Sequence, residues 1–326
     1  MPVRCESSGI DGQTTGSSAK MNPHISIAIP LHNEEACVSE LLSRLESAME
    51  PLPDCEFVFV LDGCTDRTLP LLLEAQKREK RIRVFELSRN FGLSAAVHAC
   101  LELSRGDVSV IMDGDLQDPP ELIPKLVAKL EEGYDVVFVR REARQESLGM
   151  RIMFRLFYTI QHRVADIEIP MQAGNYSCLS RKAKDEILGL SEANRFFPGL
   201  RSWIGLPSAE VLCDRKARFA GQRKQSFRRL VHYAMDGIYN FSSLPLKFSF
   251  FIGVLGLLFG FAMICNVLFQ KFVTHEAILG WTSTVICISL FSGAQLVSVG
   301  ILGSYIKRIY DEVRQRPLYV VRRRWE

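Results

Sequence analysis

The sequence lacks a CxxC pair and any cluster of histidines, although its 326 residues include nine cysteines and six histidines. This argues against a zinc site or a disulfide framework, so we expect reduced thiols. The net charge is also small: an excess of only three basic residues gives no case for nucleic acid as a partner. Residues 1–23 lack the apolar core of a signal peptide, and we expect a disordered N-terminal lead there.

Short apolar, β-branched segments alternate with segments of helical length between residues 25 and 139. This alternation predicts βαβ units and therefore an α/β fold, with a mostly parallel sheet that is covered by helices on both faces. The predicted strands are Ile25–Pro30, Glu56–Leu61, Ile82–Leu87, Val108–Met112 and Asp135–Val139.

The fourth predicted strand ends in two carboxylates, Asp113 and Asp115, which a single glycine separates. Ligands of open α/β sheets collect at the carboxyl ends of the strands, and Mg²⁺ or Mn²⁺ binds there through a few carboxylates plus substrate phosphates. The alternative is a solvated Asp-Gly-Asp turn, because both residue types are common in turns. Asp118 is the predicted N-cap of a helix that begins at Pro119.

The second half of the sequence combines basic segments with long uncharged ones. Met150–Val164 and, more weakly, Arg228–Phe241 carry a basic stripe, which fits either a helix at a membrane surface or an ordinary surface helix. Residues 248–269 and 277–306 contain no charged side chain, and each is long enough to cross a bilayer. We therefore expect two transmembrane helices. Both outer flanks are rich in Lys and Arg, so the positive-inside rule predicts that both flanks, and with them the α/β domain, lie in the cytoplasm.

Eight short motifs occur in an order typical of one enzyme family. They are IPLHNEE (29–35), LDGCTDRT (61–68), SRNFG (88–92), MDGDLQDPPELI (112–123), GYDVVFVRR (133–141), GNYSCLSRK (174–182), RFFPGLRSWIG (195–205) and RKARFAGQRK (215–224). With the two uncharged segments behind them, they resemble family 2 glycosyltransferases of the branch that charges polyprenyl phosphates, such as bactoprenol glucosyltransferases and dolichol-phosphate mannose synthases.

The resemblance implies a GT-A-type nucleotide-binding domain and a five-part organisation. The expected parts are a disordered lead (1–23), a cytoplasmic GT-A domain (24–225), a juxtamembrane interfacial helix (226–247), a two-helix transmembrane hairpin (248–306) and a basic cytoplasmic tail (307–326). We therefore expect a multi-pass protein of the inner, or cytoplasmic, membrane.

The same resemblance assigns roles to individual residues. It implies that Asp113, Asp115 and Gln117 hold Mg²⁺ or Mn²⁺ on the donor diphosphate, and that Asp115 and Asn175 act at the reaction centre. It implies a nucleotide-sugar pocket lined by Pro30, Asn33, Glu35, Asp62 and Asp113. The basic residues implied to grip the phosphates are Arg140, Arg144, Arg201, Arg215, Arg218 and Lys224.

The implied reaction is the inverting transfer of a hexose, for which glucose from UDP-glucose is the first expectation, to a polyprenyl phosphate such as undecaprenyl phosphate. A homo-oligomer, for which the family offers tetramers as a precedent, is the expected assembly. Two alternatives stay open. One is a processive polysaccharide synthase, although the QxxRW-type acceptor motif is absent before the uncharged segments. The other is a non-catalytic membrane scaffold that has kept the fold.

The sequence departs from the family pattern at three positions. Leu61 and Cys64 stand where the family usually has the first Asp and the Ser of Asp-Asp-Gly-Ser, and the first of these Asp residues often contacts the base. Asn175 stands where many relatives have Asp, which keeps a hydrogen-bonding side chain but removes a charge. Because none of the three changes affects the acidic pair, we still expect catalytic activity.

Overall fold

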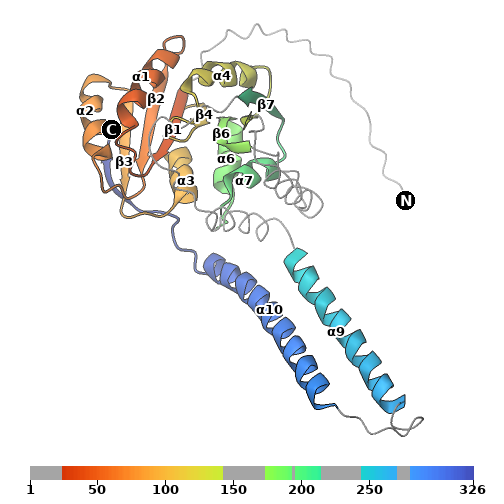
Figure 1. The fold of residues 1–326 in the computed structure, drawn as a ribbon. Helices are drawn as coiled ribbons and strands as arrows, with labels where there is room; N and C mark the ends of the chain where they lie inside the picture. Colours follow the sequence, from red (N-terminus) through yellow and green to blue (C-terminus); the bar gives the residue numbers. More distant parts are fainter. Residues whose placement is uncertain (1–23, 142–172, 193–194, 214–243, 270–279) are drawn as a thin grey trace, which may run out of the picture.

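The computed structural model describes residues 24–141, 173–192, 195–213, 244–269 and 280–326, which form an α/β domain and a long helical hairpin (Figure 1). The strands are β1 (Ile25–Leu31), β2 (Cys55–Leu61), β3 (Ile82–Leu87), β4 (Val108–Ile111), β5 (Val136–Arg141), β6 (Ala173–Ser180), β7 (Ser208–Cys213) and β8 (Val321–Trp325). They form one sheet in the order β7-β5-β6-β4-β1-β2-β3-β8.

The sheet is mostly parallel, as the sequence predicts. Strand β1 pairs in parallel with β2 and with β4, β2 with β3, and β5 with β7. Strand β6 runs antiparallel between β4 and β5, and β8 runs antiparallel along β3. The five predicted strands are confirmed to within two residues at each end, whereas β6, β7 and β8 had no prediction as strands.

Helices cover both faces of the sheet. The domain helices are α1 (Val38–Ala48), α2 (Thr68–Arg78), α3 (Leu93–Leu103), the 3₁₀ helix η1 (Pro120–Leu122), α4 (Ile123–Glu131), α6 (Arg181–Gly189) and α7 (Phe197–Trp203). Buried side chains of α1, α2 and α4 belong to one apolar cluster, and those of α3, α6 and α7 belong to a second cluster on the opposite face.

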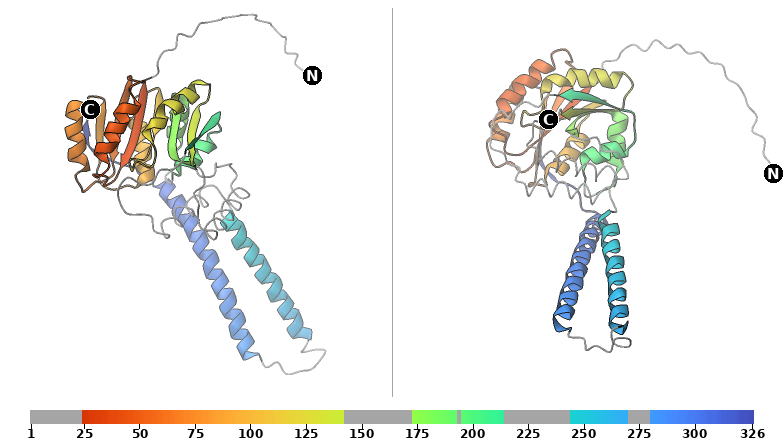
Figure 2. Two further views of the ribbon diagram at one scale, coloured as in Figure 1. Left: turned by 45° about the horizontal axis from the view of Figure 1, so that its top comes forward. Right: turned by 45° about the vertical axis from the view of Figure 1, so that its right-hand side comes forward.

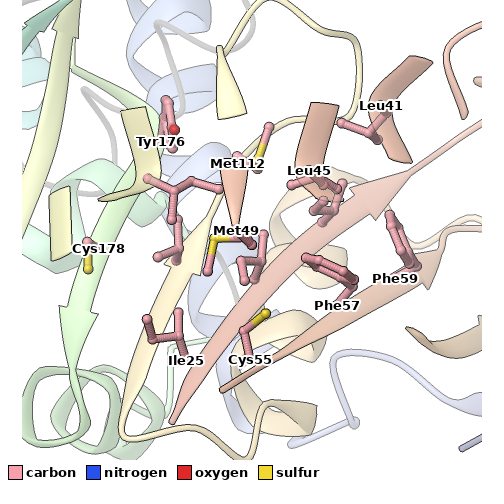
Figure 3. Packing of buried hydrophobic residues seen from close by; sticks show 14 of the residues in the cluster. Ile25, Leu41, Leu45, Met49, Cys55, Phe57, Phe59, Met112, Tyr176 and Cys178 are labelled. Atoms are coloured by element: carbon pink, nitrogen blue, oxygen red, sulfur yellow. The ribbon is translucent and has the colours of Figure 1, made fainter. Parts of the chain in front are cut away.

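Side chains from alternating positions of the strands build the larger cluster. Figure 3 shows Phe57 and Phe59 of β2 on the same side as Leu41 and Leu45 of α1. All four are at most 1% exposed. Burying an apolar side chain of this size stabilises the fold by roughly 1.5–3 kcal/mol, so this packing fixes the strand register that sets the strand ends.

The chain order places a topological switch point between β1 and β4. From β1 the chain adds β2 and then β3 on one side, and it then crosses over to place β4 on the other side of β1. In open α/β sheets the crevice outside the carboxyl ends at such a point is the usual ligand site. Asn33 follows β1 there, and the Asp113–Asp115 pair follows β4.

Two long helices, α9 (Leu244–Phe269) and α10 (Trp281–Val313), lie side by side and project away from the α/β domain (Figure 2). The rings of Phe259 and Phe291 meet at 6.1 Å between centroids. None of the helices in the described part of the chain is long and apolar enough to cross a membrane. The prediction of two transmembrane helices is therefore not supported.

The helix start that was expected at Asp118 is also different in the structure. The helical segment begins as a 3₁₀ turn at Pro120, and no side chain caps either that turn or α4. The Asp118 carboxylate instead accepts a hydrogen bond from the amide of Asp113 at 3.4 Å, so it serves the acidic turn rather than the helix. The expected lead (1–23) and the amphipathic segments 150–164 and 228–241 lie outside the described residues.

Candidate functional site

The acidic pair sits in a compact turn at the carboxyl end of β4. Asp113 and Asp115 are partly exposed, while Gly114 between them is buried. The amide of Gln117 donates to Asp115 Oδ1 at 3.1 Å, and the side-chain amide of Asn175, on the neighbouring strand β6, contacts Asp113 Oδ1 at 3.5 Å. The structure thus brings together the four residues that the sequence assigned to the metal and the reaction centre.

Strain and close packing shape this turn. Leu116 has a φ of 60°, in the left-handed region that a leucine rarely adopts, and its side chain is only 2% exposed. A Cβ at Gly114 would lie 2.1 Å from a methyl group of Leu31, so this position is close-packed against β1. Tyr176 on β6 closes the turn by donating its hydroxyl to the Pro119 carbonyl at 2.8 Å. Strain of this kind persists only where surrounding packing holds it, which is typical of functional turns.

The loops after β1 and β2 are bonded to one another. The side-chain oxygen of Asn33 accepts from the Thr65 amide at 2.8 Å, and Asn33 itself has a φ of 54°. Glu35 Oε2 accepts from the Arg67 amide at 3.0 Å, and the Glu35 amide donates to Asp66 Oδ2 at 3.1 Å. Asn33 and Glu35 therefore brace the two loops, and their contact with a nucleotide stays a prediction, as does that of the buried Pro30.

Asp62 holds a third loop, residues 88–92, against this edge of the sheet. It is 4% exposed, and its Oδ1 and Oδ2 accept from the amides of Phe91 (2.7 Å) and Gly92 (2.9 Å). Gly63, with a φ of 63°, packs so tightly on this loop that a Cβ would lie 2.4 Å from the Asn90 nitrogen. In this structure Asp62 orders the loop, and a role toward the nucleotide stays a prediction.

Two departures from the family pattern, Leu61 at the end of β2 and Cys64 in the turn after it, have different surroundings. Leu61 is 0% exposed and belongs to the larger apolar cluster, so its side chain points into the core. Cys64 Sγ lies 3.4 Å from the Asn33 amide and 3.5 Å from the Leu31 carbonyl, which joins the β1 and β2 loops. Burial raises the pKa of the Cys64 thiol to about 11, so it is a neutral packing group at neutral pH.

Two of the six predicted phosphate-binding residues, Arg201 and Arg140, lie in the described part of the chain. Arg201 on α7 is 4% exposed; it lies over the ring of Phe138 at 4.7 Å and donates to the Gly174 carbonyl at 3.2 Å, next to Asn175. Arg140 is half-exposed and pairs with Glu210 at 3.2 Å. The others, Arg144, Arg215, Arg218 and Lys224, lie outside the described residues.

The donor set at the acidic turn fits Mg²⁺ or Mn²⁺. Gln117 is 8% exposed, and its Oε1 is buried without a hydrogen-bond partner. A buried oxygen without a partner destabilises the fold unless a cation or a water molecule binds to it. Within the described residues no three Asp, Glu, His or Cys side chains form a ligand cluster. Two carboxylates and one amide leave further positions to phosphate and water, which is the arrangement that Mg²⁺ prefers.

The fold and this turn together define an α/β protein whose acidic, metal-compatible site lies at the switch point of the sheet. A mannosyltransferase from Pyrobaculum calidifontis, solved with GDP-Man and Mn²⁺, has a similar structure: TM-score 0.51 and 15% identity, with 89% of this chain and 88% of that chain covered. At this identity the comparison shows only the fold, which is of the GT-A type.

Comparisons of sequence identify the family. The family model "Glycosyl transferase family 2" matches residues 26–188. The uncharacterized glycosyltransferase YkcC of Bacillus subtilis is 38% identical, with 93% of this chain and 95% of the relative covered. A prophage-derived bactoprenol glucosyl transferase of Shigella flexneri is 32% identical, with 92% and 97% covered. The chain therefore belongs to glycosyl transferase family 2, in its polyprenyl-phosphate branch, and it is a glycosyltransferase.

Some contributors to the site had no signal in the sequence. The left-handed conformation of Leu116 could not be expected, since leucine normally avoids it. The loop 88–92 was recognised only as a motif, and the hydrogen bonds from its amides to Asp62 depend on tertiary contacts between residues 29 and 30 positions apart. Tyr176 follows Asn175 directly, and its place in the GNYS motif was the one available hint.

A part-buried histidine on α3 makes stability depend on pH. Arg195 donates to Nδ1 of His98 on α3 at 2.9 Å, which requires the neutral ring with its proton on Nε2. Burial, and then the charge of Arg195, lower the pKa of His98 to about 4. Because the unfolded chain binds this proton near pH 6.5, stability is fully present above that pH and falls as pH decreases toward about 4.

We therefore expect the free energy of unfolding to drop by about 1–2 kcal/mol between about pH 7 and about pH 5. Denaturant titration of the full chain at both pH values measures this drop. The variant His98→Gln, which has no group that titrates in this range, should lose most of it. An equal drop in the variant would contradict the assignment to His98.

Proposed function

We propose that this glycosyltransferase transfers a single hexose, with glucose as the first expectation, from a nucleotide sugar to a polyprenyl phosphate such as undecaprenyl phosphate. The observation that carries the proposal is the turn of Asp113, Asp115, Gln117 and Asn175 at the switch point, in a chain that aligns over 92% of its length with a bactoprenol glucosyl transferase. The structural relative from Pyrobaculum binds GDP-Man and Mn²⁺, which supports a divalent cation at the same kind of fold.

The proposed chemistry is a single displacement with inversion at the anomeric carbon. A bound Mg²⁺ or Mn²⁺ would supply Lewis-acid stabilisation of the charge on the departing nucleoside diphosphate. Asp113, Asp115 and Gln117 would hold the ion, and Asn175 would keep Asp113 oriented through its 3.5 Å contact. A phosphate monoester is already ionised near neutral pH, so the acceptor needs positioning rather than a general base.

The helical hairpin is the proposed membrane attachment. Large apolar side chains of α9 and α10 are exposed, including Phe250 (76%) and Leu296 (72%). Exposed apolar surface of this extent is typical of a membrane or protein interface. The basic residues around Lys307 and Arg314 would be attracted to the anionic lipids of a cytoplasmic leaflet, which supports an inner-membrane location with the catalytic domain on the cytoplasmic side. A homo-oligomer, such as a tetramer, formed through the same helices belongs to the proposal.

Transfer of radiolabel from a nucleotide sugar to a butanol-extractable lipid tests this function. The purified full chain is incubated with undecaprenyl phosphate and one of four donors: UDP-glucose, UDP-N-acetylglucosamine, GDP-mannose or a UDP-aminoarabinose derivative. We expect one donor to label the lipid with a single sugar, and EDTA to reduce labelling by at least about a hundredfold, because charge on the leaving group is then uncompensated.

Restoring Mg²⁺ or Mn²⁺ in excess over EDTA is the control, and it should restore the label. A ladder of products of increasing length would instead indicate a processive synthase. No labelled lipid from any of the four donors would contradict the proposed acceptor. EDTA-resistant labelling would contradict the metal-dependent part of the proposal alone.

A further inference from the structure

The chain returns from the hairpin to the catalytic domain as an edge strand. Helix α10 ends at Val313, and β8 then pairs antiparallel with β3. The register pairs Val321 with Leu87 and Trp325 with Val84, so the tail enters beside the carboxyl end of β3 and runs toward its amino end. It therefore passes first along the edge of the sheet that carries the acidic turn.

Anchors at both ends hold this tail in place. At its start, the Tyr319 hydroxyl donates to Glu102 of α3 at 2.6 Å. At its end, the Trp325 side chain packs against the larger apolar cluster, and its carbonyl accepts from Gln76 at 3.1 Å. The carboxylate of Glu326 forms ion pairs with Arg83, at 3.2 Å, and with Arg105. These contacts connect the tail with helix α2, helix α3 and strand β3.

The start of the tail is bonded directly to the loop 88–92. The Ser88 amide donates to the Val320 carbonyl at 2.8 Å. Residues 88–90 are exposed, so this bond and the Asp62 carboxylate hold the two ends of the loop. The same loop packs on Gly63, which follows Asp62 in the turn after β2. A continuous path of contacts therefore connects the tail with the Asp62–Gly63 turn.

We propose that the C-terminal strand, residues 319–326, is a positioning element for the donor site: by pairing with β3 and bonding Ser88, it fixes the loop 88–92 and hence the turn at Asp62. This inference rests on the proposed function for the identity of the donor. Without β8, β3 would become an exposed edge strand and Ser88 would lose its partner, so the loop would sample more conformations. Donor binding would then have to order the loop, and donor affinity would fall.

The experiment uses the full chain with Trp325→Ala, which removes the apolar anchor, and a second variant, Tyr319→Phe with Glu326→Gln, which removes the polar anchors without altering the core. Hydrogen exchange of residues 88–92 and 321–325 reports on loop and tail, and titration with UDP and Mn²⁺ reports on donor affinity. We expect faster exchange in both segments and a rise of about tenfold in the UDP dissociation constant and in the donor KM, equivalent to about 1.4 kcal/mol. We expect kcat to change less than about twofold, since the acidic turn is unaffected.

Arg323→Ala is the matched control, because this side chain is exposed on the same strand, and it should leave exchange and affinity unchanged. A variant with faster exchange at 321–325 but with UDP affinity and donor KM within about twofold of wild type would overturn the proposal. So would a fall in kcat at constant KM, which indicates a smaller folded fraction and hence a purely structural role. If the wild-type chain binds no UDP, GDP or their sugars, the proposed function fails. Unchanged exchange at 88–92 in a variant with a released tail would contradict the positioning role independently.

Discussion

Replacement of Asp115 by alanine is expected to lower the rate of sugar transfer by at least about a hundredfold, because it removes a charge that stabilises the metal and the leaving diphosphate, worth several kcal/mol. The fold should persist, since Asp115 is partly exposed and the hydrogen bond that it accepts from the Gln117 amide lies within the turn. The measurement is the initial rate of lipid labelling under saturating donor, with thermal unfolding as the check on folding.

Asp107→Ala provides the matched control. This carboxylate precedes β4, at the opposite end of the strand from Asp113 and Asp115, and pairs with the exposed Arg181 at 3.2 Å. Loss of an exposed pair costs at most about 1 kcal/mol of stability and should leave the rate within about twofold. Retention of more than about a tenth of the wild-type rate by Asp115→Ala would contradict its role as a metal ligand.

Periodicity predicted β1, β2 and β4 well because those strands are buried on both faces. Every residue of β1, β2 and β4 is buried, which gives the continuous apolar segments that the sequence shows. Strand β6 reads AGNYSCLS, and β8 reads VRRRW. Both contain polar or charged residues that local patterns assign to a loop or a tail. Their pairing depends on partners 66 or more positions away, on β4 for β6 and on β3 for β8.

The sequence predicted the position of the candidate site but not the contacts between its residues. The acidic pair after a buried strand placed Asp113 and Asp115 at the carboxyl edge, and the family resemblance named Asn175. The structure adds the 3.5 Å contact by which Asn175, on an antiparallel neighbour, reaches Asp113. By contrast, Asp62 was expected to line the nucleotide pocket, whereas here both of its oxygens accept amide hydrogens from the loop 88–92. Such bonds between distant loops have no periodic signature, so sequence patterns cannot reveal them.

A buried polar network lies at the opposite edge of the sheet, away from the acidic turn. Glu56 on β2 is 6% exposed and accepts from Ser26 (2.5 Å), from the Arg105 amide (2.7 Å) and from Arg83 (2.8 Å). Burial alone would raise the pKa of Glu56, but these hydrogen bonds and the charge of Arg83 outweigh it and lower the pKa. Glu326, at the end of β8, extends the same network through Arg83.

Replacement of Glu56 by alanine is therefore expected to destabilise the fold by about 3–5 kcal/mol, because it leaves the guanidinium of Arg83 in the interior without its main counter-charge. Chemical denaturation of the full chain measures the change. Glu79→Ala is the matched control: it breaks the Arg81 pair, which is 20–29% exposed, and should cost less than about 1 kcal/mol.

The double variant Glu56→Ala with Arg83→Met separates the two contributions to this cost. Removing the buried charge together with its partner should recover part of the loss, so the double variant should be more stable than Glu56→Ala alone. Equal destabilisation by Glu56→Ala and Glu79→Ala would instead indicate that water reaches Arg83 and solvates its charge. In that case the buried network would not be what holds β8 and Glu326 on the sheet.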